Sequence, residues 1–513
     1  MRTCCDGIGT DQLPAVMKDA IQVCRVLGIP FLWIDALCIL QDSLSDWEEQ
    51  SWEMAKIFGG SWLTICAASS FSCQEGFLNE RRPPALSFEY TSPLDPLIHG
   101  TLNFRPTPTE FDTMLPSPAR YTFLAQDLKA SRWNTRGWVF QEQLLSPRKL
   151  YFGHSMLHFQ DGNHTTSENG FTTKATLDMN LATSSNSWTI WPVLKKRKHM
   201  YALWLDIVYQ LHRLQWTHER DLFPALSGIA AAFSKATNDR YMAGHWLGDL
   251  ACNLLWHTYD KPDTIHDVLE RLSRGNVQSA PSWSWASQLE HHECAMTVIN
   301  NMRCRIRSHV RQEFEVLEAR LLLDGSNPFG TIKQASLRLS GKVIPFPETS
   351  DLARTQFIQT EWYKTDQDQW IYIEPDWTLC GPFVPASEPD SGLSVPFEET
   401  KQLKLLLVSS CCCERRGLTR RSGDVENERV NVIYKTQYRK TFFHDTSLGA
   451  SAPKFCPYCR NPRRRRDIWG LLLYPAAERG YGKFYRVGIF LCRAEHGGSD
   501  LFRDVEKSEI ELV

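Results

Sequence analysis

The stretch Phe31–Ser70, FLWIDALCILQDSLSDWEEQSWEMAKIFGGSWLTICAASS, decides the fold that we expect for this chain. It opens with four apolar residues, Phe31–Ile34, which are typical of a strand buried on both faces of a parallel sheet. A helix is expected next, because Asp46 is a good N-cap and Gly59-Gly60 is a stop signal. A second buried strand is predicted at Trp62–Ala68. A crossover of this length makes the two strands parallel, so the N-terminal part is predicted to be an α/β domain.

Polar side chains follow the first predicted strand at once: Asp35, then Cys38, Gln41 and Asp42. In open α/β sheets, ligands bind beyond the carboxyl ends of the strands. Asp35 is therefore a candidate site residue. It could equally cap the following turn, and the residues alone leave both interpretations open.

A second ordered block lies at Arg136–Arg148, RGWVFQEQLLSPR. Its apolar spacing predicts a helix that Pro147 ends. On that helix Gln141 and Glu142 lie about one turn from Arg136-Gly137. A Glu near an Arg is either a carboxylate positioned for acid–base work or a structural salt bridge at the helix start, and both interpretations stay open.

The two blocks together resemble the fungal heterokaryon-incompatibility (HET) domain. The residues that carry the resemblance are Trp33, Asp35, Cys38, Gln41, Asp46, Trp47, the strand LTICAAS, and then Arg136, Gly137, Trp138, Gln141 and Glu142. Weaker similarities continue at 220–230, 241–244 and 280–287. The resemblance covers most of the chain, although only about the first third corresponds to the HET domain proper.

This resemblance implies a fold similar to that of Toll/interleukin-receptor (TIR) domains, a doubly wound α/β sheet. It also implies a role in non-self recognition and programmed cell death in filamentous fungi. Some TIR domains cleave NAD at the nicotinamide–ribose bond. NAD would then be a substrate rather than a cofactor, and a carboxylate would stabilise the cationic ribose without a metal. The candidates for that carboxylate are Asp35, Glu142 and the pair Glu48 and Glu49.

The partners that the resemblance implies are another incompatibility or HET-domain protein and further copies of this chain. The alternative hypothesis is a non-catalytic interaction module, or a decaying HET paralogue in which the two blocks preserve only the fold. A third, weaker option is metal or anion binding through the C-terminal half.

The sequence departs from the family pattern at several positions. The family often has a Glu three residues after the Trp of the Asp-Trp pair, where this chain has Gln50. After the hairpin expected at 149–159, the chain has Gln160-Asp161 in place of an acid–Cys pattern. The chain also shows no apolar strand before the helix expected at Leu13–Gly28. We therefore expect an N-terminally truncated or degenerate HET domain.

Composition narrows the class of protein. The chain has 513 residues, 42% of them hydrophobic, with 57 basic and 59 acidic side chains, which predicts a soluble protein of several units that does not bind nucleic acid. No stretch approaches the ~18 apolar residues that cross a membrane. The N-terminus has no secretory signal, and the 16 cysteines are scattered. A cytoplasmic protein with reduced thiols is expected.

Three regions are predicted. Residues 1–164 would be the HET domain, with an insertion at 73–130 that is irregular apart from one hairpin. Residues 165–275 would be helical, because apolar residues recur at helical spacing. Residues 276–513 would be a β-rich domain with an insertion at 409–467, starting with a strand at the alternating Trp283 and Trp285.

The insertion at 409–467 holds the one CxxC motif, Cys456–Cys459, followed by the arginine run Arg463–Arg466. A zinc site normally needs two such pairs, and Pro462 breaks the helix that a redox motif requires. We therefore predict no metal site, and a solvated loop for the arginines.

Overall fold

The structure is a computed structural model. The residues it describes are 7–81, 86–95, 97–104, 123–162, 164–174, 197–258, 264–273, 280–288, 294–295, 310–347, 349–353, 361–365, 369–377, 402–411 and 465–513. They divide into two compact units. Unit 1 contains residues 1–195, 214–217 and 224–232, and unit 2 contains 196–213, 218–223 and 233–513. This division does not test the predicted boundaries at 164/165 and 275/276, which stay predictions.

Unit 1 mixes helices and strands. Its helices are the 3₁₀ turn η1 (Thr10–Gln12), α2 (Ala15–Val26), α3 (Asp35–Cys38), α4 (Leu44–Gly60), α5 (Phe123–Ala130), the 3₁₀ turn η3 (Trp133–Thr135) and α6 (Gly137–Leu145). Its strands are β1 (Thr64–Cys66), β2 (Leu86–Thr91), β3 (His99–Phe104), β4 (Lys149–Phe152), β5 (Leu157–Gln160), β6 (His164–Ser167) and β7 (Thr172–Lys174). The helices predicted at 13–28 and after Arg136 are confirmed as α2 and α6, and the hairpin predicted at 149–159 as β4–β5.

The main sheet of unit 1 has the strand order β1-β4-β5-β6-β7. Strands β1 and β4 are parallel, and the remaining pairs are antiparallel. Helices cover both faces of the parallel pair. Ala20 and Val23 of α2 pack with Ile65 and Leu150, whereas Leu124 and Leu128 of α5 pack with Cys66 and Tyr151. The mixed α/β class is as predicted, and the doubly wound, TIR-like order stays a prediction.

The predicted strand at Phe31–Ile34 is wrong. These residues form no ladder with any described strand, and the Phe31 side chain is 86% exposed. An apolar run becomes a strand only where a neighbour accepts its backbone hydrogen bonds. Only the inner residues contribute to the core: Leu32 packs beside α2, and Trp33 lies edge-on to Phe58. The parallel partner of β1 is therefore β4, and not this run.

Two further local predictions are corrected. The N-cap of α4 is Ser43, not Asp46, because the Ser43 hydroxyl accepts the hydrogen bond of the Asp46 amide. Asp46 lies in the first turn, where its carboxylate accepts from the Leu40 amide. The insertion expected at 73–130, irregular with one hairpin, does contain a hairpin, β2–β3, but it ends in the buried helix α5, which was not predicted.

Unit 2 has helices α7 (Arg197–Leu211), α9 (Leu250–Asn253), α10 (Ile265–Ser273) and short 3₁₀ turns, while α8 (Leu222–Thr237) contributes to both units. Its strands are β8 (Tyr241–Met242), β9 (His245–Trp246), β10 (His257–Thr258), β11 (Cys294–Ala295), β12 (Arg311–Gln312), β13 (Glu315–Leu323), β14 (Ile332–Pro345), β15 (Thr349–Ala353), β16 (Glu361–Thr365), β17 (Trp370–Pro375), β18 (Lys404–Cys411), β19 (Asp467–Pro475), β20 (Lys483–Cys492) and β21 (Lys507–Leu512). The β-rich C-terminal sheet is confirmed, as are the helical segments before it.

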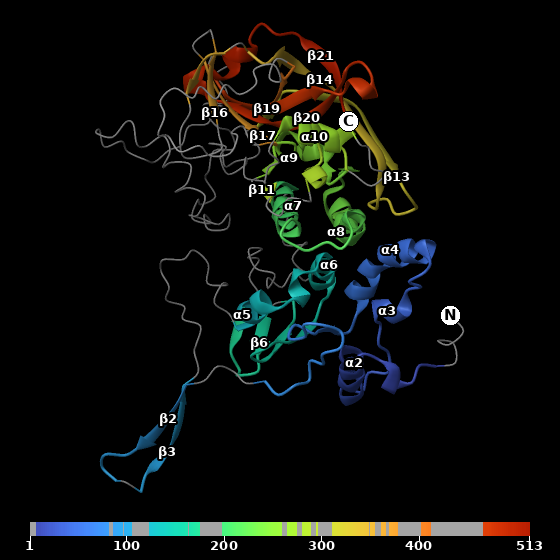
Figure 1. Ribbon diagram of the computed structural model, residues 1–513, viewed down its shortest axis with the longest axis vertical. Helices are drawn as coiled ribbons and strands as arrows, with labels where there is room; N and C mark the ends of the chain where they lie inside the picture. Colours follow the sequence, from blue (N-terminus) through green and yellow to red (C-terminus); the bar gives the residue numbers. More distant parts are fainter. Residues whose placement is uncertain are drawn as a thin grey trace. The chain divides into compact units, whose positions relative to one another are not determined.

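The large sheet of unit 2 closes on itself. Strand β18 pairs with β14 and β19, β20 pairs with β19 and β21, and β21 returns to β14 (Figure 1). Closure leaves these five strands without free edges. The core of this sheet contains Leu405, Leu472 and Val487, and α10 packs Ile265 and Val268 onto it.

The predicted strand at Trp283 and Trp285 is wrong, because the segment is a turn followed by a 3₁₀ helix at Trp285–Gln288. Both indoles are buried, and the serine hydroxyls bond to backbone atoms of other segments. The alternation of Trp and Ser therefore serves a buried turn instead of the two faces of a sheet.

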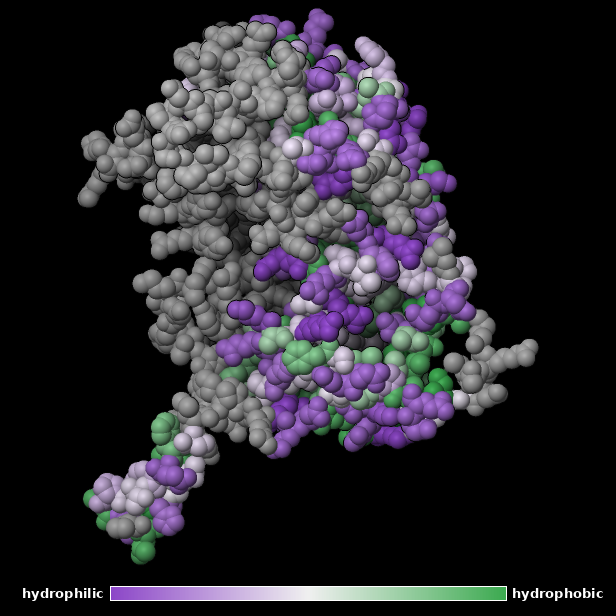
Figure 2. All heavy atoms as spheres, in the orientation of Figure 1, coloured by the Kyte–Doolittle hydropathy of each residue, from purple (hydrophilic) through white to green (hydrophobic). Residues whose placement is uncertain are grey.

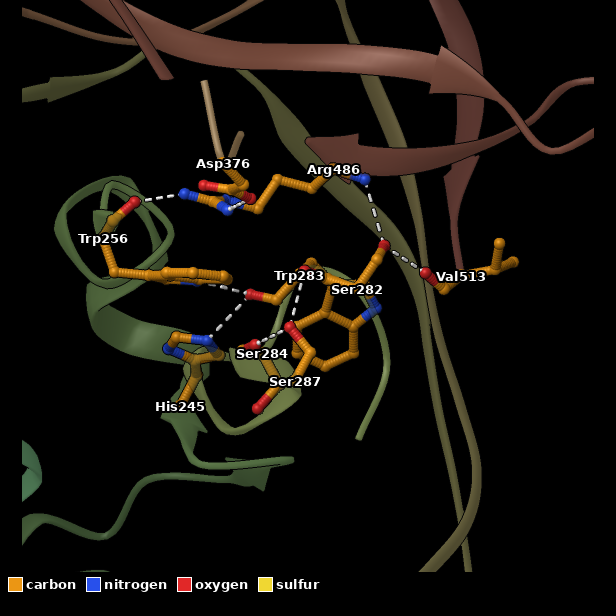
Figure 3. A network of polar contacts seen from close by, with 9 residues as sticks. All are labelled: His245, Trp256, Ser282, Trp283, Ser284, Ser287, Asp376, Arg486 and Val513. Atoms are coloured by element: carbon orange, nitrogen blue, oxygen red, sulfur yellow. Dashed lines mark hydrogen bonds and ion pairs between the residues drawn. The ribbon is translucent and has the colours of Figure 1, made fainter. Parts of the chain in front are cut away.

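A buried polar network holds this turn in place (Figure 3). Arg486 donates to the Asp376 carboxylate and to the Trp256 carbonyl, and its guanidinium carbon lies 3.4 Å from the centroid of the Trp256 ring. The Arg486 amide donates to Ser282 at 3.0 Å. A fully buried charge is tolerated only when it is paired in this way, so we assign the network a structural role.

The arginine run and the CxxC motif lie mostly outside the described residues. Arg465 and Arg466 are described, and Arg465 pairs with Asp500 at 2.6 Å. Among the described helices, none is long and apolar enough to cross a membrane.

Candidate functional site

The helix α6 positions the second motif, and Gly137 at its start has a steric role. A Cβ atom at Gly137 would lie 2.5 Å from the Trp216 ring. The Gly137 amide donates to the Gln215 carbonyl at 3.1 Å, and the Gln215 amide donates back to Thr135 at 2.7 Å. Residues 214–217 therefore fix the entry to α6 and the direction in which its side chains point.

Glu142 lies on α6 and is only partly exposed. The pKa of Glu142 is raised to about 7, first by burial and then by the negative charge of Asp35, while Arg136 opposes the shift. The structure thus brings Asp35, Glu142 and Arg136 into one electrostatic group, although Asp35 is far from the other two in sequence. Two carboxylates and a guanidinium in one group, with one carboxyl group whose pKa lies near neutral pH, are typical of catalytic sites.

Asp35 is the first residue of α3 and is exposed to solvent. One of its carboxylate oxygens accepts from the next amide, that of Ala36, at 2.7 Å. Gln41 folds over the same turn and donates to the Ile39 carbonyl at 3.0 Å. The N-cap of α3 is Ile34, so the capping role considered for Asp35 is wrong, and Asp35 instead lies in the first turn, from which its charge acts on Glu142.

The other motif residues are mainly structural. Trp47 and Trp138 meet edge to face, with ring centroids 6.0 Å apart, and join α4 to α6. Gln141 is fully buried, and its carbonyl oxygen accepts from the Gly228 amide at 3.2 Å. Cys38 is an exposed thiol on α3, and Glu49 is an exposed carboxylate on α4. Glu49 is not among the charges that act on Glu142.

The N-terminal part of the chain, which contains these residues, matches a known protein family. A family model described as "Heterokaryon incompatibility protein (HET)" matches residues 3–142. The chain carries a HET domain. The match includes Asp35, Arg136 and Glu142, and the family of the matched domain implies a role in heterokaryon incompatibility. No curated protein and no solved structure matches the chain.

Sequence reasoning missed one cation close to the HET-domain site. Lys149, the first residue of β4, is buried and donates to the Gln143 and Ser146 carbonyls at 3.0 Å, and burial lowers its pKa to about 8. Burial also raises the pKa of the neighbouring Cys66 thiol. Lys149 thus satisfies carbonyls at the C-terminal end of α6. Nothing in a Pro-Arg-Lys sequence indicates that the lysine is the buried residue.

A second feature missed from the sequence is a buried chain of three polar side chains, one inside the matched residues and two beyond them. Asp127 accepts from His158 at 2.9 Å, and the other ring nitrogen of His158 lies 2.8 Å from the Ser167 hydroxyl. The order resembles an acid–base–nucleophile triad. All three side chains are buried, however, so no substrate reaches the hydroxyl, and the chain joins α5 to β5 and β6.

The described residues contain no group of three His, Cys, Asp or Glu side chains that could hold a metal ion. Glu142, Asp35 and Arg136 form the candidate site, and their side chains can supply charge and proton transfer.

Proposed function

We propose that this protein is an incompatibility effector of filamentous fungi, and that its HET domain cleaves NAD at the bond between nicotinamide and ribose. The observation that supports the proposal is the raised pKa of Glu142, to about 7, beside Asp35 and Arg136. A carboxylate that titrates near neutral pH can stabilise a cation when ionised and can also take up a proton.

The proposed reaction uses the carboxylate twice. As the C1′–N bond breaks, both electrons go to the nicotinamide nitrogen, which becomes neutral, and positive charge develops on the ribose. Ionised Glu142 stabilises that cation. Water then adds to C1′ and gives its proton to Glu142, so the products are nicotinamide and ADP-ribose.

Arg136 has a separate role in the proposal. Its side chain is exposed at the N-terminal end of α6, and a guanidinium binds phosphate oxygens with two parallel hydrogen bonds. The diphosphate of NAD is the anionic part of the substrate that Arg136 would hold. That contact would place the ribose toward the acids.

The decisive experiment compares two equal exchanges, Glu142→Gln and Glu49→Gln, in the purified chain. The first removes the proposed catalytic charge, and the second removes an exposed carboxylate of α4 that does not act on Glu142. We expect NAD cleavage at pH 7.5 to fall at least about 100-fold in Glu142→Gln and to stay within about twofold in Glu49→Gln. Chromatographic release of nicotinamide measures both.

Each other outcome has a clear meaning. Equal loss in both variants would contradict the assignment to Glu142, and no cleavage by the unmodified chain would contradict the NAD reaction. In that second case the HET domain would be a non-catalytic interaction module. Induced expression in hyphae, with viability as the signal, then tests whether cell death and a partner HET protein are involved at all.

A further inference from the structure

The hairpin of β2 and β3 has one apolar face and one polar face. Phe88 is paired with Leu102, and Tyr90 is paired with Gly100, so these residues share a face. The opposite face carries Glu89 paired with Thr101, whose hydroxyl donates to the carboxylate at 3.1 Å. This alternation is the pattern of a sheet with one side buried against something.

The apolar face is nevertheless exposed. Phe88, Tyr90 and Leu102 are 54%, 42% and 46% exposed, and at the turn Leu94 and Leu97 are 95% and 88% exposed, as the green side chains of this hairpin indicate (Figure 2). In the part of the chain that the structure describes, no third strand joins the pair (Figure 1). An isolated two-stranded hairpin is at best marginally stable in water, so its apolar face needs a cover.

The charges of the hairpin favour a second copy of the chain over a lipid surface. Its two strands and turn contain Glu89 and Asp95 but no Lys or Arg, whereas surfaces that bind anionic lipids carry clusters of basic residues. Glu89 lies on the opposite face, and the Asp95 carboxylate is turned back onto the loop, where it accepts from the Leu97 amide at 2.9 Å, so two apolar faces can meet without directly opposed charges. A two-fold axis would bring the same apolar face of each copy into contact.

The available area is sufficient for a weak dimer. Phe88, Tyr90 and Leu102 on the apolar face, together with Leu94, Leu97 and Ile98 at the turn end of the hairpin, present on the order of 700 Å² per copy, taking about 150–250 Å² for a fully exposed large side chain. Two copies would bury about 1,400 Å², within the roughly 1,200–2,000 Å² of specific interfaces.

We propose that the apolar face of the β2–β3 hairpin packs against the same face of a second copy of this chain. The two hairpins then form a four-stranded sandwich with the Glu89 faces outward. The proposal goes beyond NAD cleavage and does not depend on it, because it concerns a surface formed by neither Glu142 nor Asp35.

Sedimentation of the full chain between about 1 and 100 µM tests the proposal with two matched variants. Phe88→Thr with Leu102→Thr leaves a Thr–Thr cross-strand pair on the apolar face. Glu89→Thr leaves a Thr–Thr pair with Thr101 on the polar face. We expect the unmodified chain and Glu89→Thr to rise from 59.0 kDa toward twice that mass. In the apolar-face variant the dissociation constant should increase at least about 10-fold.

If the unmodified chain stays at 59.0 kDa over the whole concentration range, the proposal is overturned. Equal association by all three proteins would overturn it as well. Circular dichroism of the apolar-face variant separates lost association from lost folding. Flotation with phosphatidylcholine vesicles tests the competing cover, and binding that needs Phe88 and Leu102 in monomeric protein would assign the face to a lipid surface instead.

Discussion

The pKa of Glu142 shows how burial and one neighbouring charge together change the chemistry of a carboxyl group. Its pKa is raised to about 7 by burial and by Asp35, against the opposing Arg136. For an acid whose pKa is raised on folding, stability is full below the unfolded value and is lost as pH rises through the folded value. As pH rises from about 4.5 to 7, the carboxyl group of Glu142 is ionised in the unfolded chain but still protonated in the folded chain. The folded state therefore loses stability over this range. Glu142→Gln removes that cost, so a loss of activity in this variant would not come from unfolding.

The variant Asp35→Asn tests the coupling directly. Without the Asp35 charge, the pKa of Glu142 decreases, and the limb of activity that rises with pH should move about one pH unit lower. The measurement is kcat/KM for NAD as a function of pH, with Asp42→Asn, an exposed acid of the same turn region, as control. An unmoved limb would mean that the two carboxylates do not interact in solution, whatever the change in maximal rate.

The sequence indicates these residues but not their association. Asp35 and Glu142 each lie within a recognisable motif. Each could also have had a purely structural role, as a cap for Asp35 and as a salt bridge for Glu142. Their proximity depends on how α3 and α6 pack, which no local pattern encodes. Lys149 could not be found at all, because nothing in the local sequence shows that this cation folds back onto the Gln143 and Ser146 carbonyls at the end of α6.

At the scale of elements, α6 depends on a close contact at its first residue. Gly137 leaves room for the Trp216 ring, which a Cβ atom would meet at 2.5 Å. Trp216 is a large ring in a short segment that also bonds to Gly137 through Gln215. The start of the helix and residues 214–217 therefore hold each other in place.

The exchange Gly137→Ala should cost about 1–3 kcal/mol of stability through this overlap. Gly59→Ala in α4 is the matched control, because a Cβ atom at Gly59 meets nothing within 4 Å. Alanine there should stabilise the helix by up to about 1 kcal/mol. Urea unfolding of both variants, followed by circular dichroism, gives the two values. Similar effects at both positions would contradict the role of Trp216.

Elements with a periodic apolar face were predictable, and elements that need a distant partner were not. The helices α2 and α6 carry their own signal in the spacing of apolar residues. The run Phe31–Ile34 has the composition of a strand but no partner in the described sheet, and the Trp283–Trp285 alternation belongs to a turn. Composition alone does not supply the hydrogen-bonded neighbour that defines a strand.

At the scale of the whole molecule, the side chains of His212 and His245 are buried in unit 2. Burial lowers the pKa of His212 and of His245 to about 3. His245 lies 3.1 Å from the Trp283 carbonyl through one ring nitrogen, and His212 packs edge-on to Trp285 without a hydrogen bond among the described residues. For a base whose pKa is lowered on folding, stability is lost as pH falls below the unfolded value.

The exchange His212→Phe should make unit 2 more resistant to acid. Between pH 6.5 and 5, the unmodified chain should lose about 2 kcal/mol more than the variant, since each pH unit of difference is worth about 1.4 kcal/mol. His218→Phe, at an exposed position six residues later, should leave the acid loss unchanged. Urea titrations at the two pH values measure the effect, and equal losses in all three proteins would contradict it.

The tryptophans of unit 2 give that unit an optical signal of its own. Trp204 and Trp285 both donate to the Gly244 carbonyl at 2.9 Å, and Trp246 stacks on Phe233 in the same core. These indoles are fully buried, whereas every described tryptophan of unit 1 is at least partly exposed, and Trp62 is 58% exposed. Indole emission moves to longer wavelength when water reaches the ring, so the blue part of the native fluorescence comes from unit 2. Its loss marks the opening of that unit, while the emission of Trp62 changes little.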